Sequence, residues 1–141
     1  MYSAIDLSKY IINKCSCDKK PISNLQLQKI LYYIQREFLK KDSQAFPDSI
    51  EAWQFGPVVP NSYYNFCGFG SMPISIDYDS TILLDSNDAI IIDAIIETKR
   101  LLNPWDLVDD THKDGGAWAK IYDNGNGNHK EIPVSLIKEV G

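Results

Sequence analysis

The sequence predicts a mainly α-helical protein, a compact single-domain helical bundle with a short extended segment or small two-stranded β element around residues 50–56. Apolar residues recur at helical spacing along most of the chain, and residues that cap helices precede several of these runs. One stretch rich in glycine and proline lies between two of the helical segments. The length of 141 residues suits one domain, residues 1–141, with a single hydrophobic core.

Two helices are predicted near the N-terminus. The first runs from Ser3 to about Cys15, where apolar residues are spaced three and four positions apart. A polar break at residues 17–21 separates it from the second helix. Ser23 is expected to cap that second helix, and Gln26, three residues later, completes a capping box.

The second helix is expected to be the central helix of the core. Ile22 and Leu27 occupy the two positions of a hydrophobic staple at its start. An apolar stripe then follows one face for three turns, at Leu27, Ile30, Leu31, Ile34 and Phe38. Off this stripe lie Gln28, Tyr32 and Gln35, which either face solvent or reach toward the tryptophan-containing segment that comes next.

The segment Glu51–Pro60 is the least ordinary part of the sequence. Residues 51–55 nearly alternate polar and apolar side chains, which indicates a short extended run. Gly56 permits backbone conformations that a Cβ would resist, and Pro57 fixes its own φ angle. Pro60 suits the first position of a helix. Two interpretations follow: a structural turn packed on the core, or a binding corner presented by the helices.

The second half of the chain contains further predicted helices, each with apolar spacing or a cap, at residues 61–66, 87–102, 104–112, 117–122 and 132–140. Ser86 is expected to cap the 87–102 helix, and its β-branched run would suit a strand only if the segment were shorter. Residues 71–85 are expected to form a loose link, for which a strand at 74–78 or at 81–84 is one interpretation.

Composition narrows the classes of function. With 14 basic and 19 acidic residues, a net charge of −5 and a pI near 4.9, broad binding to nucleic-acid phosphates is not expected. No targeting segment and no apolar run long enough to cross a bilayer is found, so no membrane partner is expected. Three cysteines, an odd number, suit a reducing cytoplasm.

An acidic helix around His112 allows two interpretations. Asp109 is expected to pair with Lys113, which leaves Asp106 and Asp110 as like charges on neighbouring turns. The carboxylates and the imidazole could form a metal or acid–base centre, but no second cluster of ligands completes the shell. We therefore favour a solvated acidic face, and expect no catalytic residue, no metal and no cofactor.

Three blocks of residues carry a resemblance to a known family. They are Leu25–Gln35, Glu51–Pro60 followed by Tyr63, and Thr111–His112 with Trp118. Together they resemble the Panacea domain, a family of phage-associated proteins that includes SocA-type and GepA-type proteins. The resemblance extends from Ile5 to about Ile137. One departure is Ala117, where the family pattern has a proline before the second tryptophan.

The resemblance implies a largely helical, non-enzymatic antitoxin that binds and neutralises a cognate toxin encoded beside it. Alternatives are a proteolytic adaptor, which would add a protease as a partner, and a metal-dependent hydrolase centred on Asp106–His112. On this basis we expect a toxin-contact surface that is formed or braced by Trp53, Phe55, Gly56, Pro57, Val58 and Tyr63, and supported from behind by Thr111, His112 and Trp118.

Overall fold

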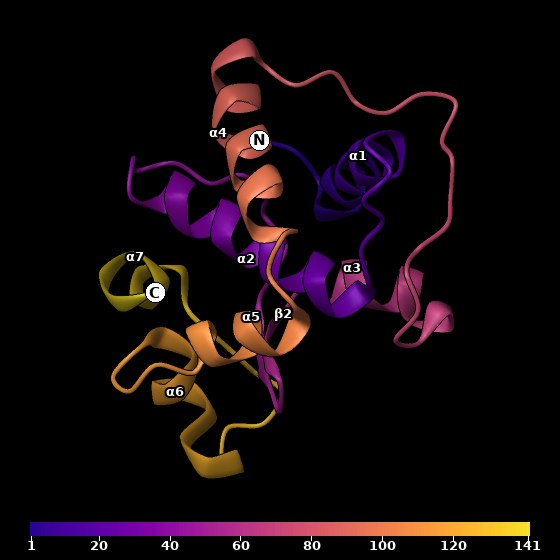
Figure 1. Ribbon diagram of the computed structural model, residues 1–141. Helices are drawn as coiled ribbons and strands as arrows, with labels where there is room; N and C mark the ends of the chain where they lie inside the picture. The colour runs from indigo at the N-terminus through magenta and orange to yellow at the C-terminus, as the bar shows by residue number, and fades with distance from the viewer.

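The computed structural model describes residues 1–141 and consists mainly of helices (Figure 1). In chain order its elements are α1 (Ala4–Cys17), α2 (Asn24–Leu39), β1 (Glu51–Trp53), β2 (Gly56–Val58), α3 (Pro60–Phe66), α4 (Ser86–Lys99), α5 (Pro104–Thr111), α6 (Ala117–Tyr122), β3 (Lys130–Glu131) and α7 (Val134–Val140). Two short 3-10 helices, Cys67–Phe69 and Asp123–Gly125, follow α3 and α6. The predicted mainly helical fold with a small β element near residues 50–56 is confirmed, although the sheet has three strands instead of two.

Helix α2 begins with the predicted capping box. The Ser23 hydroxyl accepts the Gln26 backbone N–H at 3.3 Å, and the Gln26 side chain accepts the Ser23 backbone N–H at 2.9 Å. Two of the N–H groups that a helix leaves without a partner are satisfied in this way. The cap therefore fixes where the central helix starts.

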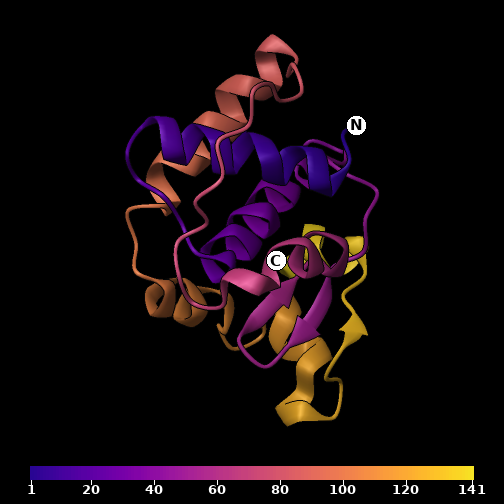
Figure 2. The same ribbon diagram turned by 90° about the vertical axis from the view of Figure 1, so that its right-hand side faces the viewer.

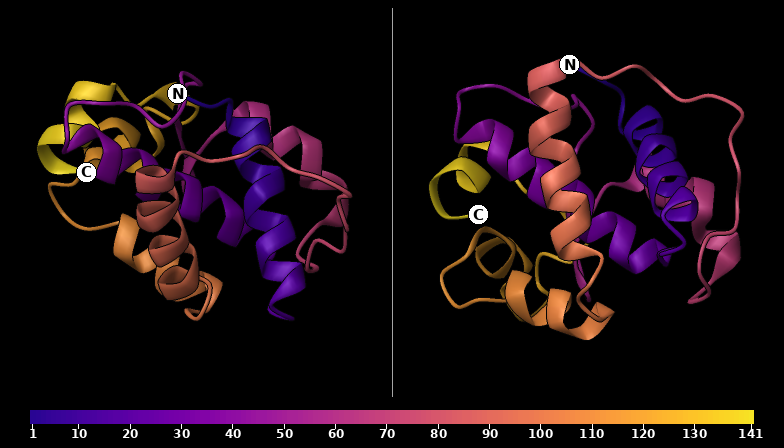
Figure 3. Two further views of the ribbon diagram at one scale, coloured as in Figure 1. Left: turned by 90° about the horizontal axis from the view of Figure 1, so that it is seen from above. Right: turned by 45° about the horizontal axis from the view of Figure 1, so that its top comes forward.

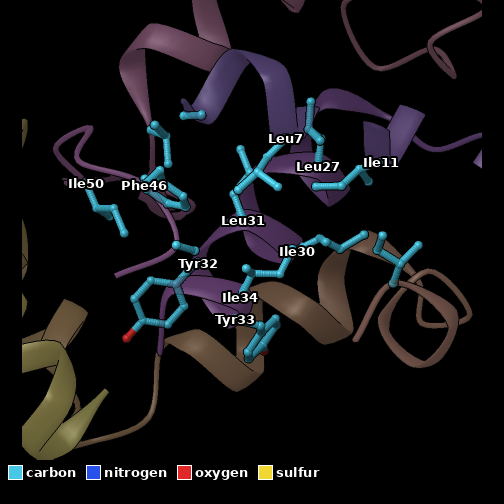
Figure 4. Close-up of a cluster of buried hydrophobic side chains, with 14 of the residues drawn as sticks. Leu7, Ile11, Leu27, Ile30, Leu31, Tyr32, Tyr33, Ile34, Phe46 and Ile50 are labelled. Atoms are coloured by element: carbon cyan, nitrogen blue, oxygen red, sulfur yellow. The ribbon is translucent and has the colours of Figure 1, made fainter. Parts of the chain in front are cut away.

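The middle of the molecule is occupied by α2, which packs against α1, α3, α4, α5, α7 and β2 (Figures 1 and 3). The predicted stripe is buried, since Leu27, Ile30, Leu31 and Ile34 have no solvent exposure. Figure 4 shows this stripe beside Leu7 and Ile11 of α1. Burying each such side chain contributes about 1.5–3 kcal/mol, so this face contributes substantially to the packing energy.

Contrary to the simple amphipathic pattern, the other faces of α2 are also buried. Gln28, Tyr32 and Gln35 are each at most 3% exposed, so the solvent-facing alternative for them is wrong. The Gln35 carboxamide donates to the Phe46 carbonyl and accepts the Ala45 N–H, both at 2.8 Å. These bonds hold the segment before β1 against the helix.

The link between α3 and α4 passes around the outside of α1 without forming a strand (Figures 1 and 2). Its Ile74 N–H donates to the Ile22 carbonyl at 2.8 Å, and its Tyr78 N–H donates to the Asn13 side chain at 3.3 Å. A strand at 74–78 or 81–84 is therefore wrong. In the first of these stretches, the Ile74 and Tyr78 N–H groups are satisfied by the α1–α2 turn and by α1 instead of by a neighbouring strand.

Several helix boundaries differ from the predicted ones. Asp85 caps α4, its side chain accepting the Asn87 N–H at 3.0 Å, so Ser86 is the first helical residue and not the cap. The same helix ends at Lys99, three residues earlier than expected, and α7 begins at Val134 because Pro133 precedes it. No helix in the structure has both the length and the hydropathy that crossing a bilayer requires.

The sheet has the strand order β2-β1-β3, and both pairings are antiparallel. Trp53 is paired with Gly56 at the hairpin end, and Glu51 lies between Val58 and Glu131. Strand β3 was not predicted, because its two residues are exposed and give no alternating pattern. Its pairing with β1 nevertheless places residues 129–131 directly beside the hairpin.

Candidate functional site

The β1–β2 hairpin turns at a glycine that no other residue could replace without strain. Gly56 has a φ angle of +116°, which residues with a side chain rarely adopt. A Cβ at this position would lie 2.7 Å from Cε of Lys29 and 2.8 Å from Oγ1 of Thr111. The hairpin backbone can therefore approach α2 and α5 this closely only with glycine here.

Two consecutive residues of α2 form hydrogen bonds with backbone groups at the outer edge of β2 and just after it. The Lys29 amine donates to the Pro57 carbonyl at 3.1 Å, and the Gln28 carboxamide oxygen accepts the Val59 N–H at 3.0 Å. Edge strands otherwise expose such groups to unwanted pairing. The helix thus holds the hairpin in one position and takes the place of a neighbouring strand.

Lys29 is fully buried and has no carboxylate partner in the structure. Burial lowers the pKa of Lys29 to about 7, because the charged ammonium loses its hydration inside the protein. The sequence analysis did not predict that this lysine is buried. The available signal was the pair Tyr32–Tyr33 beside it, since two aromatic residues off the stripe indicate that this face is buried as well.

Trp53 is held on four sides. Its indole N–H donates to the Glu51 carboxylate at 2.9 Å, and its carbonyl accepts the Trp118 indole N–H at 2.8 Å. The ring stacks on His129 with a centroid distance of 4.2 Å and an angle of 4° between planes. Tyr63 packs edge-on against it at 4.9 Å. These contacts hold the Trp53 side chain in one position in the absence of a partner.

The Trp53 side chain borders a surface cavity of about 490 Å³. The residues around it come from α2, the hairpin, α3 and its 3-10 extension, the start of α5 and the loop before β3: Asn24, Leu25, Gln28, Trp53, Gln54, Phe55, Val58, Tyr63, Cys67, Gly70, Ser71, Trp105, Asn128 and His129. None is an aspartate, glutamate, lysine or arginine. The cavity is thus aromatic and apolar with a few carboxamides, the composition common in binding sites.

Two large aromatic side chains stand exposed on the rim of this cavity. Phe55, at the hairpin turn, is 46% exposed, and Trp105, the second residue of α5, is 59% exposed. Their rings meet edge to face at 5.5 Å. Sequence reasoning named Phe55 and missed Trp105 and His129, because nothing in the local pattern places α5 or the loop before β3 beside the hairpin.

The three residues expected behind the surface, Thr111, His112 and Trp118, do not line the cavity. Thr111 is buried and donates its hydroxyl to the Val108 carbonyl at 3.0 Å. The His112 ring stacks on Trp118 at 3.6 Å, and Trp118 in turn holds the Trp53 carbonyl. Burial, together with the nearby charge of Lys29, lowers the pKa of His112.

The acidic helix α5 is arranged differently from the prediction. Lys113 pairs with Asp110 at 3.0 Å, so the expected pair with Asp109 is wrong. Asp110 also accepts a hydrogen bond from the Tyr33 hydroxyl. Burial opposes ionisation of Asp110, but these two bonds outweigh it and keep the pKa of Asp110 below its usual value. No group of three or more His, Cys, Asp or Glu side chains is placed to hold a metal ion.

Comparison with known proteins identifies the class of protein. Residues 27–119 match the family described as antitoxin SocA-like, Panacea domain, and the chain belongs to this family. Among characterised relatives it is similar to "Antitoxin SocA" of Caulobacter vibrioides (strain NA1000 / CB15N). The two are 27% identical over 146 residues, which cover 95% of this chain and 77% of the relative. No solved structure matches the chain significantly.

Proposed function

We propose that this protein is an antitoxin that neutralises a cognate toxin by direct protein–protein binding through the hairpin surface. The observation that carries the proposal is the uncharged aromatic cavity with Phe55 and Trp105 exposed on its rim, in a member of the SocA-like family. Large aromatic side chains that remain exposed beside a cavity are typical anchors of protein interfaces.

The residues around the hairpin have different roles in this proposal. Phe55, Trp53, Val58 and Tyr63 border the cavity and provide the contact area. Gly56 and Pro57 are buried, and they shape the turn without touching the toxin. Thr111, His112 and Trp118 support the hairpin from the side away from the cavity, through the Trp118 hydrogen bond to Trp53.

Rigidity supports this assignment. The hairpin is bonded along one edge by α2 and along the other by β3, and the Trp53 ring is packed between His129 and Tyr63. A surface that is already ordered loses little conformational entropy on binding. The net charge of −5 would in addition speed the encounter with a basic partner.

Co-expression with the protein encoded by the adjacent gene tests the proposal. If that protein arrests growth, this chain should relieve the arrest and co-purify with it. Phe55→Asp, which places a charge on the rim, should abolish relief. Ile90→Asp, which places a charge on a more exposed aliphatic position of α4 (71% exposed), should leave relief intact.

Two results would contradict the proposal: no complex with a toxic neighbour, or equal relief by both variants. Toxin levels in cells with and without their cytoplasmic proteases separate neutralisation by binding from delivery to a protease. Binding predicts a stable, inactive toxin in both strains, whereas delivery predicts that the toxin disappears only where the protease is present.

A further inference from the structure

No lysine, arginine, aspartate or glutamate side chain lines the cavity beside Trp53, and His129 contributes its one imidazole. The chain has 14 basic and 19 acidic residues, yet none of them lines this cavity. A charged group placed there would lose hydration without gaining an opposite charge, which is strongly unfavourable. The occupant must therefore be uncharged where it enters.

The inner end of the cavity is apolar and already satisfied. Leu25 and Val58 contribute aliphatic surface, and Val58 is only 5% exposed. The carboxamides of Asn24 and Gln28 form a hydrogen bond with each other at 3.0 Å and further hydrogen bonds with neighbouring groups. Neither side chain therefore needs a hydrogen bond from a ligand. This inner end favours an aliphatic or aromatic group over a polar one.

The rim, in contrast, has free hydrogen-bonding groups. The carboxamides of Gln54 and Asn128 lie at the border of the cavity, are exposed, and make no side-chain hydrogen bond within the protein. Each offers both a donor and an acceptor, the combination that an extended peptide backbone requires. A nucleotide would instead need lysine or arginine side chains for its phosphates, and neither lines the cavity.

Charge next to the cavity points to the same kind of partner. Trp105 is followed by Asp106 and Asp109 on α5, and neither carboxylate forms an ion pair. Lys113, which follows the end of this helix, is paired with Asp110. Basic residues flanking an apolar anchor would complement this edge.

From these features we propose that the cavity takes an extended segment of the toxin, with one large uncharged side chain inserted beside Trp53 and its backbone bonded by Gln54 and Asn128. Basic residues of the same segment would face α5. This inference rests on the proposed antitoxin function and specifies the toxin chemistry that the site recognises.

Two exposed cysteines make the inference testable without altering the core. Cys67 lines the cavity, Cys17 lies at the end of α1, and the third thiol, Cys15, is buried. Bound toxin should slow alkylation of Cys67 by iodoacetamide at least tenfold and leave the rate at Cys17 unchanged. Cys17 is thus a control within the same molecule.

A blocking variant provides the second arm. Ser71 is exposed at the cavity border, so Ser71→Trp should fill the entrance without disturbing the fold, and Ser71→Ala is its control. We expect Ser71→Trp to weaken toxin binding at least tenfold and Ser71→Ala to change it less than twofold. Titration with N-acetyltryptophanamide should shift the NMR signals of the Trp53 and Trp105 indoles, whereas N-acetyllysinamide and adenosine monophosphate should not.

The outcomes separate this inference from the function on which it rests. Toxin that binds tightly to Ser71→Trp, with Cys67 still alkylated at its free rate, would overturn the cavity inference and leave the antitoxin function standing. Stronger shifts with adenosine monophosphate than with N-acetyltryptophanamide would also overturn it, in favour of a nucleotide site. Absence of any toxin complex would overturn both.

Discussion

The amine of Lys29 donates to the carbonyl of Pro57 at 3.1 Å from a fully buried position, with no carboxylate to neutralise it. A single hydrogen bond does not offset the free energy that an ammonium group loses when its hydration is removed. The neutral amine is therefore favoured inside the protein, and the pKa of Lys29 falls to about 7. One buried bond thus links the hairpin to the central helix and makes the fold sensitive to pH.

The first prediction concerns that sensitivity. Between pH 7 and 8.5 the unfolded chain keeps Lys29 protonated, near the ordinary pKa of 10.5, while the folded chain releases the proton. The unfolded state then binds more protons, so the free energy of unfolding should rise with pH, by roughly 1–2 kcal/mol over this window. Urea unfolding at several pH values measures it.

Lys29→Met is the control for this pH effect, because methionine fills similar space and does not titrate. The rise between pH 7 and 8.5 should disappear in the variant, whatever its absolute stability. An identical rise in both proteins would show that another group is responsible. The raised pKa values of Cys15 and of the buried tyrosines act in the opposite direction and at higher pH, so this window avoids them.

The second prediction concerns Gly56. Gly56→Ala should lower the free energy of unfolding by about 2–4 kcal/mol, since it adds an unfavourable φ angle and a clash with Lys29 and Thr111. Gly115→Ala also introduces alanine at a positive φ angle but has open space around it, so it should cost only about 1–2 kcal/mol. Thermal unfolding of the two variants measures the difference, and equal losses would show that the contact with α2 and α5 is unimportant.

The third prediction concerns the bond behind the hairpin. Trp118→Phe keeps an aromatic ring for stacking on His112 and Tyr122 but removes the N–H that reaches the Trp53 carbonyl. An unsatisfied carbonyl in this partly buried place should cost about 1–3 kcal/mol. Hydrogen exchange around Trp53 should become faster in the variant, and unchanged exchange would mean that the bond does not hold the hairpin.

Much of the fold could be predicted because it depends on local signals. Neighbouring residues alone define the capping box at Ser23 and Gln26 and the apolar stripe from Leu27 to Phe38. Both features are present in the structure. No strand formed in the 71–85 link, since the Ile74 and Tyr78 N–H groups bond to the α1–α2 turn and to α1 instead of to a neighbouring strand. Strand formation depends on a partner that the local sequence does not show.

The site was only half predictable for the same reason. The block from Trp53 to Pro57 stands out by its combination of aromatic residues, glycine and proline, and its Trp53, Gln54 and Phe55 line the cavity. Trp105 and His129 lie at the same cavity although they are far away in the sequence, and their local patterns indicate only a helix start and a loop. Lys29 was missed because a lysine off an apolar stripe ordinarily faces solvent.

The measurement that tests the account most directly is the affinity for the toxin of a protein whose exposed aromatic pair has been removed. Phe55→Ala combined with Trp105→Ala should raise the dissociation constant at least 30-fold, about 2 kcal/mol. Thermal stability should change little, because the two residues are 46% and 59% exposed and lie outside the hydrophobic core. Ile90→Ala on α4 is the matched control and should bind as the unmodified protein does. An unchanged dissociation constant for the double variant would contradict the claim that the hairpin surface is where the toxin binds.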